Sequence, residues 1–115
     1  MLKFVDLPKN TPVTESVDSR RNNFKEIYAR YEKDKALEQA SRCSQCGIPF
    51  CQVHCPLQNN IPDWLKLTAE ERLEEAYEIA SLTNNMPEVC GRICPQDRLC
   101  EGNCVIEKSG HGAVT

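Results

Sequence analysis

The sequence has 115 residues and a formal net charge of −3, and 40% of its residues are hydrophobic but only 6% are aromatic. This length fits one small domain, and a domain of this size normally buries roughly two-thirds of its unfolded surface. Because little bulky apolar material is available, we expect something besides a hydrophobic core to hold the fold. The acidic balance argues against a nucleic-acid partner, and no apolar run reaches the length of a membrane span.

The N-terminal region, residues 1–18, carries Pro8, Pro12 and several small polar residues, and we expect it to be an extended arm. It lacks the continuous apolar stretch of a signal peptide, so the predicted location is the cytoplasm. Thiols stay reduced in that compartment, where a cysteine-rich chain is expected to bind metal rather than to form disulfides.

Residues 19–115 are expected to form the domain itself, and helical periodicity starts near Asn22. Apolar side chains recur there as on one face of a helix, and these are Phe24, Ile27, Tyr28 and Tyr31. A second helix is predicted from Asp34 to about Cys43. The following stretch, up to Asn59, is rich in cysteine and proline and is predicted to be a loop.

A third helix is predicted to begin after Asn60, a residue type that favours the N-cap, with Pro62 in its first turn. Thr68 and Glu71 form a capping-box pattern, which predicts the start of a further helix that ends near Asn84. The outer face of that helix is expected to be a solvated acidic surface formed by Glu70, Glu71, Glu74, Glu75 and Glu78. No alternation typical of strands is present, so the predicted fold is a small all-α domain with two cysteine-rich loops.

The eight cysteines fall into two groups with different spacings. The first group is Cys43-x2-Cys46-x4-Cys51-x3-Cys55, and the second is Cys90-x3-Cys94-x5-Cys100-x3-Cys104. Disulfides, zinc sites and iron–sulfur clusters are the three interpretations. Disulfides are disfavoured by the absence of a secretory signal. Structural zinc sites commonly use two Cys-x2-Cys pairs, and this chain has one.

Iron–sulfur clusters fit these spacings best. A 4Fe–4S cluster needs four ligands that lie further apart than those of a zinc ion, typically a close run of three cysteines and one ligand from distant sequence. In ferredoxins with two such clusters, the fourth cysteine of the run, followed by proline, ligates the other cluster. Cys55 precedes Pro56 in this way. We therefore expect Cys43, Cys46 and Cys51 to bind one cluster, Cys55 to cross to a second, and the second loop to return one of its own cysteines.

Four segments of the chain carry a resemblance to a known family: CGIPFC (46–51), HCPL (54–57), NIPDWLKL (60–67) and PEVCGRICPQDRLCEGNC (87–104). With them, the chain resembles the N-terminal iron–sulfur domain of the small (β) subunit of bacterial NADPH-dependent glutamate synthase. The same module heads dihydropyrimidine dehydrogenase and related flavoprotein reductases. The resemblance implies a helical domain of the α-helical ferredoxin type, in which the two cysteine-rich loops enclose two 4Fe–4S clusters.

The resemblance also implies a set of ligands. The first cluster would be held by Cys43, Cys46, Cys51 and Cys104. The second would be held by a Glu or Gln just beyond Thr115 together with Cys55, Cys94 and Cys100. Cys90 would then be spare, a small buried residue, unless it replaces the missing ligand. Three basic residues near the cysteines could favour a reduced cluster, but they are expected to be solvated at the surface, and these are Arg42, Arg92 and Arg98.

By the same resemblance, the domain would contain no catalytic residue and would relay single electrons. They would pass from NADPH-reduced FAD through the two clusters to the FMN of a large subunit, which makes glutamate from glutamine and 2-oxoglutarate. The FAD- and NADPH-binding domains of that oxidoreductase would follow residue 115, so the chain is expected not to turn over alone. Two alternatives stay open: the same module in another flavin-dependent reductase, of the dihydropyrimidine dehydrogenase or ferredoxin-linked type, and a zinc-stabilised interaction domain.

Overall fold

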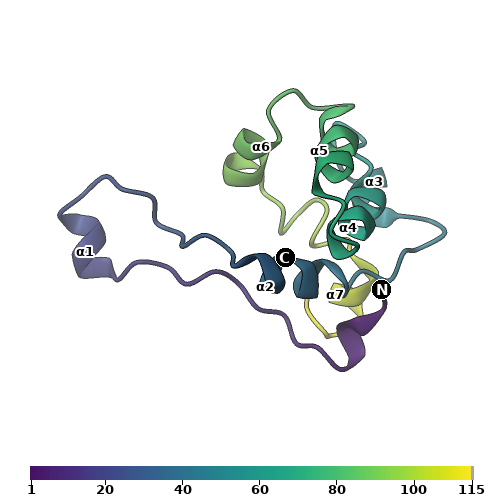
Figure 1. Cartoon of the computed structure of the whole chain (residues 1–115), viewed down its shortest axis with the longest axis horizontal. Coiled ribbons are helices and arrows are strands. Elements are labelled where there is room, and N and C mark those ends of the chain that lie inside the picture. The colour runs from purple at the N-terminus through teal and green to yellow at the C-terminus, as the bar shows by residue number, and fades with distance from the viewer. Residues whose placement is uncertain (115) are drawn as a thin grey trace.

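The computed structural model describes residues 1–114, in which short helices are joined by irregular connections (Figure 1). In chain order they are the 3-10 helix η1 (Lys3–Val5) and the α-helices α1 (Val17–Arg21), α2 (Lys33–Ala40), α3 (Phe50–Val53), α4 (Ile61–Ala69), α5 (Leu73–Ser81), α6 (Pro87–Ile93) and α7 (Val105–Lys108). Among these residues, the extended backbone forms one isolated bridge, between Thr14 and Tyr28, and no named strand. The prediction of an all-α fold is therefore confirmed. None of the helices in residues 1–114 has the length and apolar character needed to cross a membrane.

The centre of the helical body is α4, which packs against α5, α2 and α3 (Figure 1). Leu65 of α4 is buried together with Ala40 and Cys43. The indole Nε1 of Trp64 donates to Asn59 Oδ1 at 2.9 Å, and Asn59 Nδ2 donates to the carbonyl of Ala80 at 2.7 Å. These two bonds join the start of α4 to the last turn of α5, so the two longest helices form one rigid pair.

The start of α4 agrees with its predicted position, after Asn60 and with Pro62 in the first turn. The predicted capping box at Thr68 is wrong, because Thr68 lies in the last turn of α4 and its hydroxyl donates to the carbonyl of Trp64 at 2.7 Å. Glu71 then takes a left-handed backbone conformation with φ 64°, which turns the chain, and α5 begins only at Leu73.

The predicted helix over Asn22–Tyr31 is wrong as well. The side-chain amide of Asn22 donates to the carbonyl of Asp18 at 2.9 Å, and that of Asn23 donates to the carbonyl of Ser19 at 2.8 Å, so both side chains compete with helix continuation. Beyond them the chain reverses and pairs with residues 13–15. Phe24, Ile27 and Tyr28 are instead exposed, and Phe24 projects fully into solvent. Tyr31 is half-buried, and its hydroxyl donates to the carbonyl of Asn10.

Residues 11–32 extend away from the helical body as a long two-legged projection with α1 near its far end (Figure 1). The segment before it is held at the body, because the amide of Leu2 donates to the carbonyl of Cys43 at 2.9 Å. α2 ends at Ala40, three residues before the predicted end. Single turns follow it, and the amide of Cys43 donates to the carbonyl of Ala40 at 3.2 Å. These turns deliver Cys43 into the interior.

The protein is open for its size. Its accessible surface is 7946 Å², whereas a compact protein of this mass exposes about 6,300 Å². The buried hydrophobic residues are few and mostly small, namely Ala40, Cys43, Leu65, Ala76, Ile106 and Ala113. The expectation of a weak apolar core is confirmed, and it makes the contribution of each buried side chain large relative to the total stability.

We expect Leu65→Ala to lower the free energy of unfolding by about 2–4 kcal/mol, because it deletes a buried side chain and leaves a cavity. The matched control is Leu82→Ala, which removes the same atoms from a side chain that is 73% exposed and should change stability by less than about 0.5 kcal/mol. Urea unfolding followed by circular dichroism measures both. Equal losses for the two variants would contradict the packing described.

Candidate metal centre

All eight cysteines line one cavity of about 920 Å³ that lies between the α4–α5 pair, α6 and the C-terminal segment. The rest of its wall is mainly apolar, with contributions from Leu65, Ala76 and Ile106. Each of the eight is a free thiol. The structure therefore gathers two cysteine groups that are distant in sequence around a single apolar space.

Four of the thiols enter the cavity from α2, α3 and α7. Cys43 follows α2, Cys46 lies in the next turn, and Cys51 is the second residue of α3. Cys104 comes from the other end of the chain, as the residue before α7. Burial, with smaller contributions from the charges of Cys104, Cys43 and Cys46, raises the pKa of Cys51 to about 11. The four sulfurs thus lie close enough to influence one another.

The other four thiols lie near α6. Cys90 lies within α6, Cys94 follows its last residue, and Cys55 approaches from the end of α3. Burial raises the pKa of Cys94, with smaller contributions from the charges of Cys55 and Cys90. Burial also raises the pKa of Cys100, and the charge of Cys94 makes a smaller contribution in the same direction. Cys90 consequently lies near Cys94, as does Cys55, and both Cys55 and Cys94 are expected ligands.

The turn that follows Cys43 supplies polar contacts to sulfur. Gln45 has a left-handed backbone with φ 52°, and its side-chain amide donates to Cys43 Sγ at 3.4 Å and to the carbonyl of Pro62 at 2.6 Å. The hydroxyl of Ser44 lies 3.0 Å from Cys46 Sγ. Donors to a thiolate stabilise its charged form, so the Gln45 amide partly offsets the burial that raises the pKa of Cys43. Sequence inspection missed Gln45, whose role depends on a contact 17 positions away.

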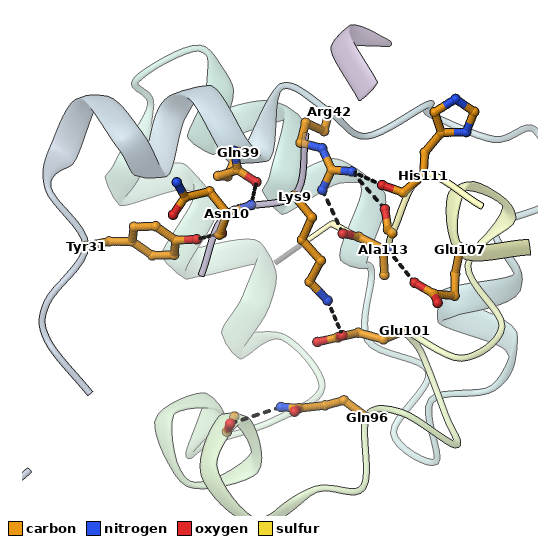
Figure 2. Close-up of polar contacts among 12 residues, drawn as sticks. Lys9, Asn10, Tyr31, Gln39, Arg42, Gln96, Glu101, Glu107, His111 and Ala113 are labelled. Atoms are coloured by element: carbon orange, nitrogen blue, oxygen red, sulfur yellow. Dashed lines mark hydrogen bonds and ion pairs between the residues drawn. The ribbon is translucent and has the colours of Figure 1, made fainter. Parts of the chain in front are cut away.

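The loop that carries Cys100 and Cys104 is closed by tight backbone packing. A side chain at Gly102 would overlap the carbonyl oxygen of Asp97, so only glycine fits there. Gln96 accepts the amides of Glu101 and Gly102 on its carbonyl oxygen, at 3.0 and 3.2 Å. Its side chain donates to the carbonyl of Gly91 at 2.9 Å, which fastens the loop to α6 (Figure 2).

Among the basic residues near the cysteines, Arg42 differs most from expectation. It was predicted to be a solvated surface residue, but its side chain is completely buried and bonded to backbone carbonyls (Figure 2). Arg92 does lie at the surface, where it pairs with Glu26 at 2.6 Å and covers the ring of Tyr28. The burial of Arg42 could not be read from the sequence because its partners include residues 111–113.

The donor set of the cavity fits an inorganic iron–sulfur group. Thiolates are soft ligands that suit iron–sulfur clusters, and an apolar wall that excludes water is typical around them. Among residues 1–114, no three His, Cys, Asp or Glu side chains converge closely enough to hold one metal ion. The expected Glu or Gln ligand beyond Thr115 lies outside the described residues.

Comparison with known proteins also points to an iron–sulfur cluster domain. A family model described as dihydropyrimidine dehydrogenase domain II, 4Fe-4S cluster, matches residues 20–115. The chain is similar to the glutamate synthase (NADPH) small chain of Azospirillum brasilense, with 68% identity over 115 residues, which is 100% of this chain and 24% of that protein. The small chain of the same name from Escherichia coli K12 is 48% identical over 113 residues, 98% of this chain and 24% of that protein.

A further relative carries a different name. The Escherichia coli K12 protein AegA, named as an oxidoreductase, is 46% identical over 101 residues, which is 87% of this chain and 15% of that protein. This chain therefore spans about a quarter of the length of the two glutamate synthase relatives, and less of AegA.

The thiol pKa values predict a pH dependence of cluster assembly. Burial keeps Cys43, Cys51, Cys94 and Cys100 protonated to higher pH than free cysteine, and ligands must lose their protons to bind metal. We expect the initial rate of anaerobic reconstitution with ferrous iron and sulfide to rise between pH 6.5 and 8.5. The rise should be roughly tenfold per pH unit for each thiol that must ionise before the slow step. Visible absorbance measures the rate, and circular dichroism checks that the helix content is constant. A rate that is flat, or faster at the acidic end, would contradict this account.

Proposed function

Because this chain belongs to the dihydropyrimidine dehydrogenase domain II family of 4Fe-4S cluster domains, we propose that it holds two such clusters and relays electrons within a glutamate synthase. Membership of the family and similarity to glutamate synthase small chains identify the domain as an iron–sulfur electron-transfer module. The observation that carries the proposal is the convergence of all eight cysteines on one apolar cavity.

The proposed ligands follow the two sets of neighbouring thiols. One cluster is held by Cys43, Cys46, Cys51 and Cys104, and the mutual influence of these four sulfurs supports the assignment. The other is held by a Glu or Gln after Thr115 and by Cys55, Cys94 and Cys100. Cys90 is the spare thiol of this proposal, although it lies beside Cys94. Cys55 and Cys104 cross between the two cysteine groups, so each cluster ties the two loops together.

Each part of the cavity wall has a definite task in this proposal. The clusters supply one-electron redox chemistry when bound. The apolar residues of α4, α5 and α7 exclude water from the sulfurs, and the Gln45 amide places a donor on Cys43 Sγ. Hydrogen bonds to cluster sulfurs and low solvent exposure are the means by which a protein sets reduction potential. The protein thus holds, shields and tunes the clusters, and no catalytic side chain is needed.

The proposed electron path is that of the relatives' named enzyme. NADPH reduces FAD in domains that follow residues 19–115, the clusters accept the electrons one at a time, and the FMN of a large subunit receives them. Glutamate then forms there from glutamine and 2-oxoglutarate. The proposed location is the cytoplasm, and the chain by itself should not turn over. The relatives' greater length and the words "small chain" in their name support further domains and a larger partner.

A second candidate is the same module in another flavin-dependent reductase. The match to AegA, named as an oxidoreductase and not as a glutamate synthase, favours keeping this alternative. A dihydropyrimidine dehydrogenase-like or ferredoxin-linked enzyme would use the cavity in the same way, with a different final acceptor. A zinc-stabilised interaction domain differs in its chemistry, because its cysteines would carry zinc and no acid-labile sulfide.

The ligand assignment predicts different effects for two cysteines that face the same cavity. Anaerobically prepared protein should contain about eight irons and eight sulfides per chain, four of each per cluster. Cys55→Ala removes a proposed ligand and should lower both values to about four. Cys90→Ala is the matched control and should leave both values near eight. Iron and acid-labile sulfide analysis, with the thermal unfolding midpoint to confirm folding, measures the three proteins.

Two outcomes would overturn parts of the proposal. Zinc without sulfide in the unaltered protein would refute cluster binding altogether. A loss of four irons in Cys90→Ala but none in Cys55→Ala would exchange the roles of the two residues.

A further inference from the structure

Arg42 is a completely buried cation that joins the two ends of the chain. Its Nε donates to the carbonyl of Leu7 at 2.9 Å, and its Nη1 donates to that of Ala113 at 2.8 Å. Its Nη2 donates to the carbonyls of His111 at 2.7 Å and Gly112 at 2.8 Å (Figure 2). One guanidinium thereby joins the backbone at residue 7 to the backbone at residues 111–113, more than 100 positions away in sequence.

The charge of Arg42 is not neutralised by a carboxylate in the described part of the chain. All four acceptors of the guanidinium are backbone carbonyls, and none of the ion pairs found among residues 1–114 includes it. Burying a charge without a counter-charge is costly, and hydrogen bonds to neutral carbonyls offset only part of that cost. A positive charge retained here points to a negative one nearby.

The wall of the cysteine cavity lies directly beside the guanidinium. Arg42 precedes Cys43, and Ala113, which accepts its Nη1–H, lines the cavity together with Cys43 and Cys104. Two of the proposed ligands of the first cluster are therefore within electrostatic reach of this cation.

A cluster becomes more negative by one charge when it accepts an electron. A fixed positive charge in a poorly hydrated site stabilises that additional charge much more than it would in water, so it raises the reduction potential. We propose that Arg42 is a positioning residue that closes the chain ends over the cavity and raises the reduction potential of the cluster held by Cys43, Cys46, Cys51 and Cys104. The inference rests on the proposed function, because it requires that cluster to be present.

Charge and shape can be separated with three variants of the cluster-loaded protein. Arg42→Met removes the charge and should shift the reduction equilibrium of one cluster at least about tenfold towards the oxidised form, about 59 mV more negative for a one-electron couple. Arg42→Lys keeps the charge but cannot reach four carbonyls, so it should lower the unfolding midpoint while changing that equilibrium by less than about threefold. Arg21→Met removes a charge whose side chain is 76% exposed, at α1, and should change neither quantity.

Redox titrations monitored by electron paramagnetic resonance provide the potentials, and iron and sulfide analysis provides the cluster content. If Arg42→Met retains its clusters and both potentials equal those of the unaltered protein, the inference is wrong. If the unaltered protein contains no iron and sulfide, the proposed function itself fails. Lower stability in both Arg42 variants with no change in either potential would leave Arg42 only a structural role and would refute the tuning.

A second measurement needs no variant and decides the matter if Arg42→Met does not assemble clusters. Energetic coupling between two sites is reciprocal, so reduction of the cluster must strengthen the clasp that favours it. Hydrogen exchange of the His111 and Ala113 amides, which are bonded to the Ile106 carbonyl and to Glu107 Oε2, should be slower in the reduced protein than in the oxidised one. Exchange in α1 should be unchanged. Equal exchange at residues 111–113 in the two redox states would overturn the inference.

Discussion

The rest of the structure depends on the need to hold eight thiols around one apolar cavity. A chain of this size would ordinarily fill its interior with large side chains, but here the interior is a cavity of about 920 Å³. Few large apolar side chains are buried, and the main ones, Leu65 and Ile106, line that cavity. Metal binding and folding are coupled in small domains of this kind, so the clusters take the place that a hydrophobic core has in other proteins.

The short helices follow from the same constraint. None exceeds nine residues among those in residues 1–114, and helices of this length are marginal on their own in water. Several of them begin or end close to a cysteine, as α2 before Cys43 and α7 after Cys104 show. Stability must therefore come from contacts that link the ends of different helices to one another. Arg42 is one such link, since it fastens Leu7 and residues 111–113 behind the cavity wall.

The chemistry of the site could be predicted from sequence because it depends on residue type and spacing. Eight cysteines in two closely spaced groups, two of them followed by proline, indicate clusters whatever the path of the backbone. The start of α4 could also be predicted, since Asn60 and Pro62 act locally. The helix expected over Asn22–Tyr31 could not be excluded in this way. Its apolar period is genuine, but Asn22 and Asn23 bind the carbonyls of α1 and reverse the chain.

Long-range contacts account for the other differences. Thr68 and Glu71 have the letters of a capping box, yet the packing of α4 against α5 requires the turn to come later, at Glu71. The burial of Arg42 arises from carbonyls about 70 positions away, and the contact of Gln45 with Pro62 arises from the approach of α4. No local pattern reports such contacts, so neither the burial of Arg42 nor the contacts of Gln45 could be predicted from the sequence.

The central claim is that one cavity holds two clusters close to each other, with Cys55 and Cys104 crossing between the cysteine groups. Electron paramagnetic resonance of the fully reduced protein tests this most directly. Two reduced clusters in one cavity should give about two unpaired spins per chain, with signals broadened and split by their magnetic interaction. A single unsplit signal of about one spin, or no signal in protein that binds only zinc, would contradict the account.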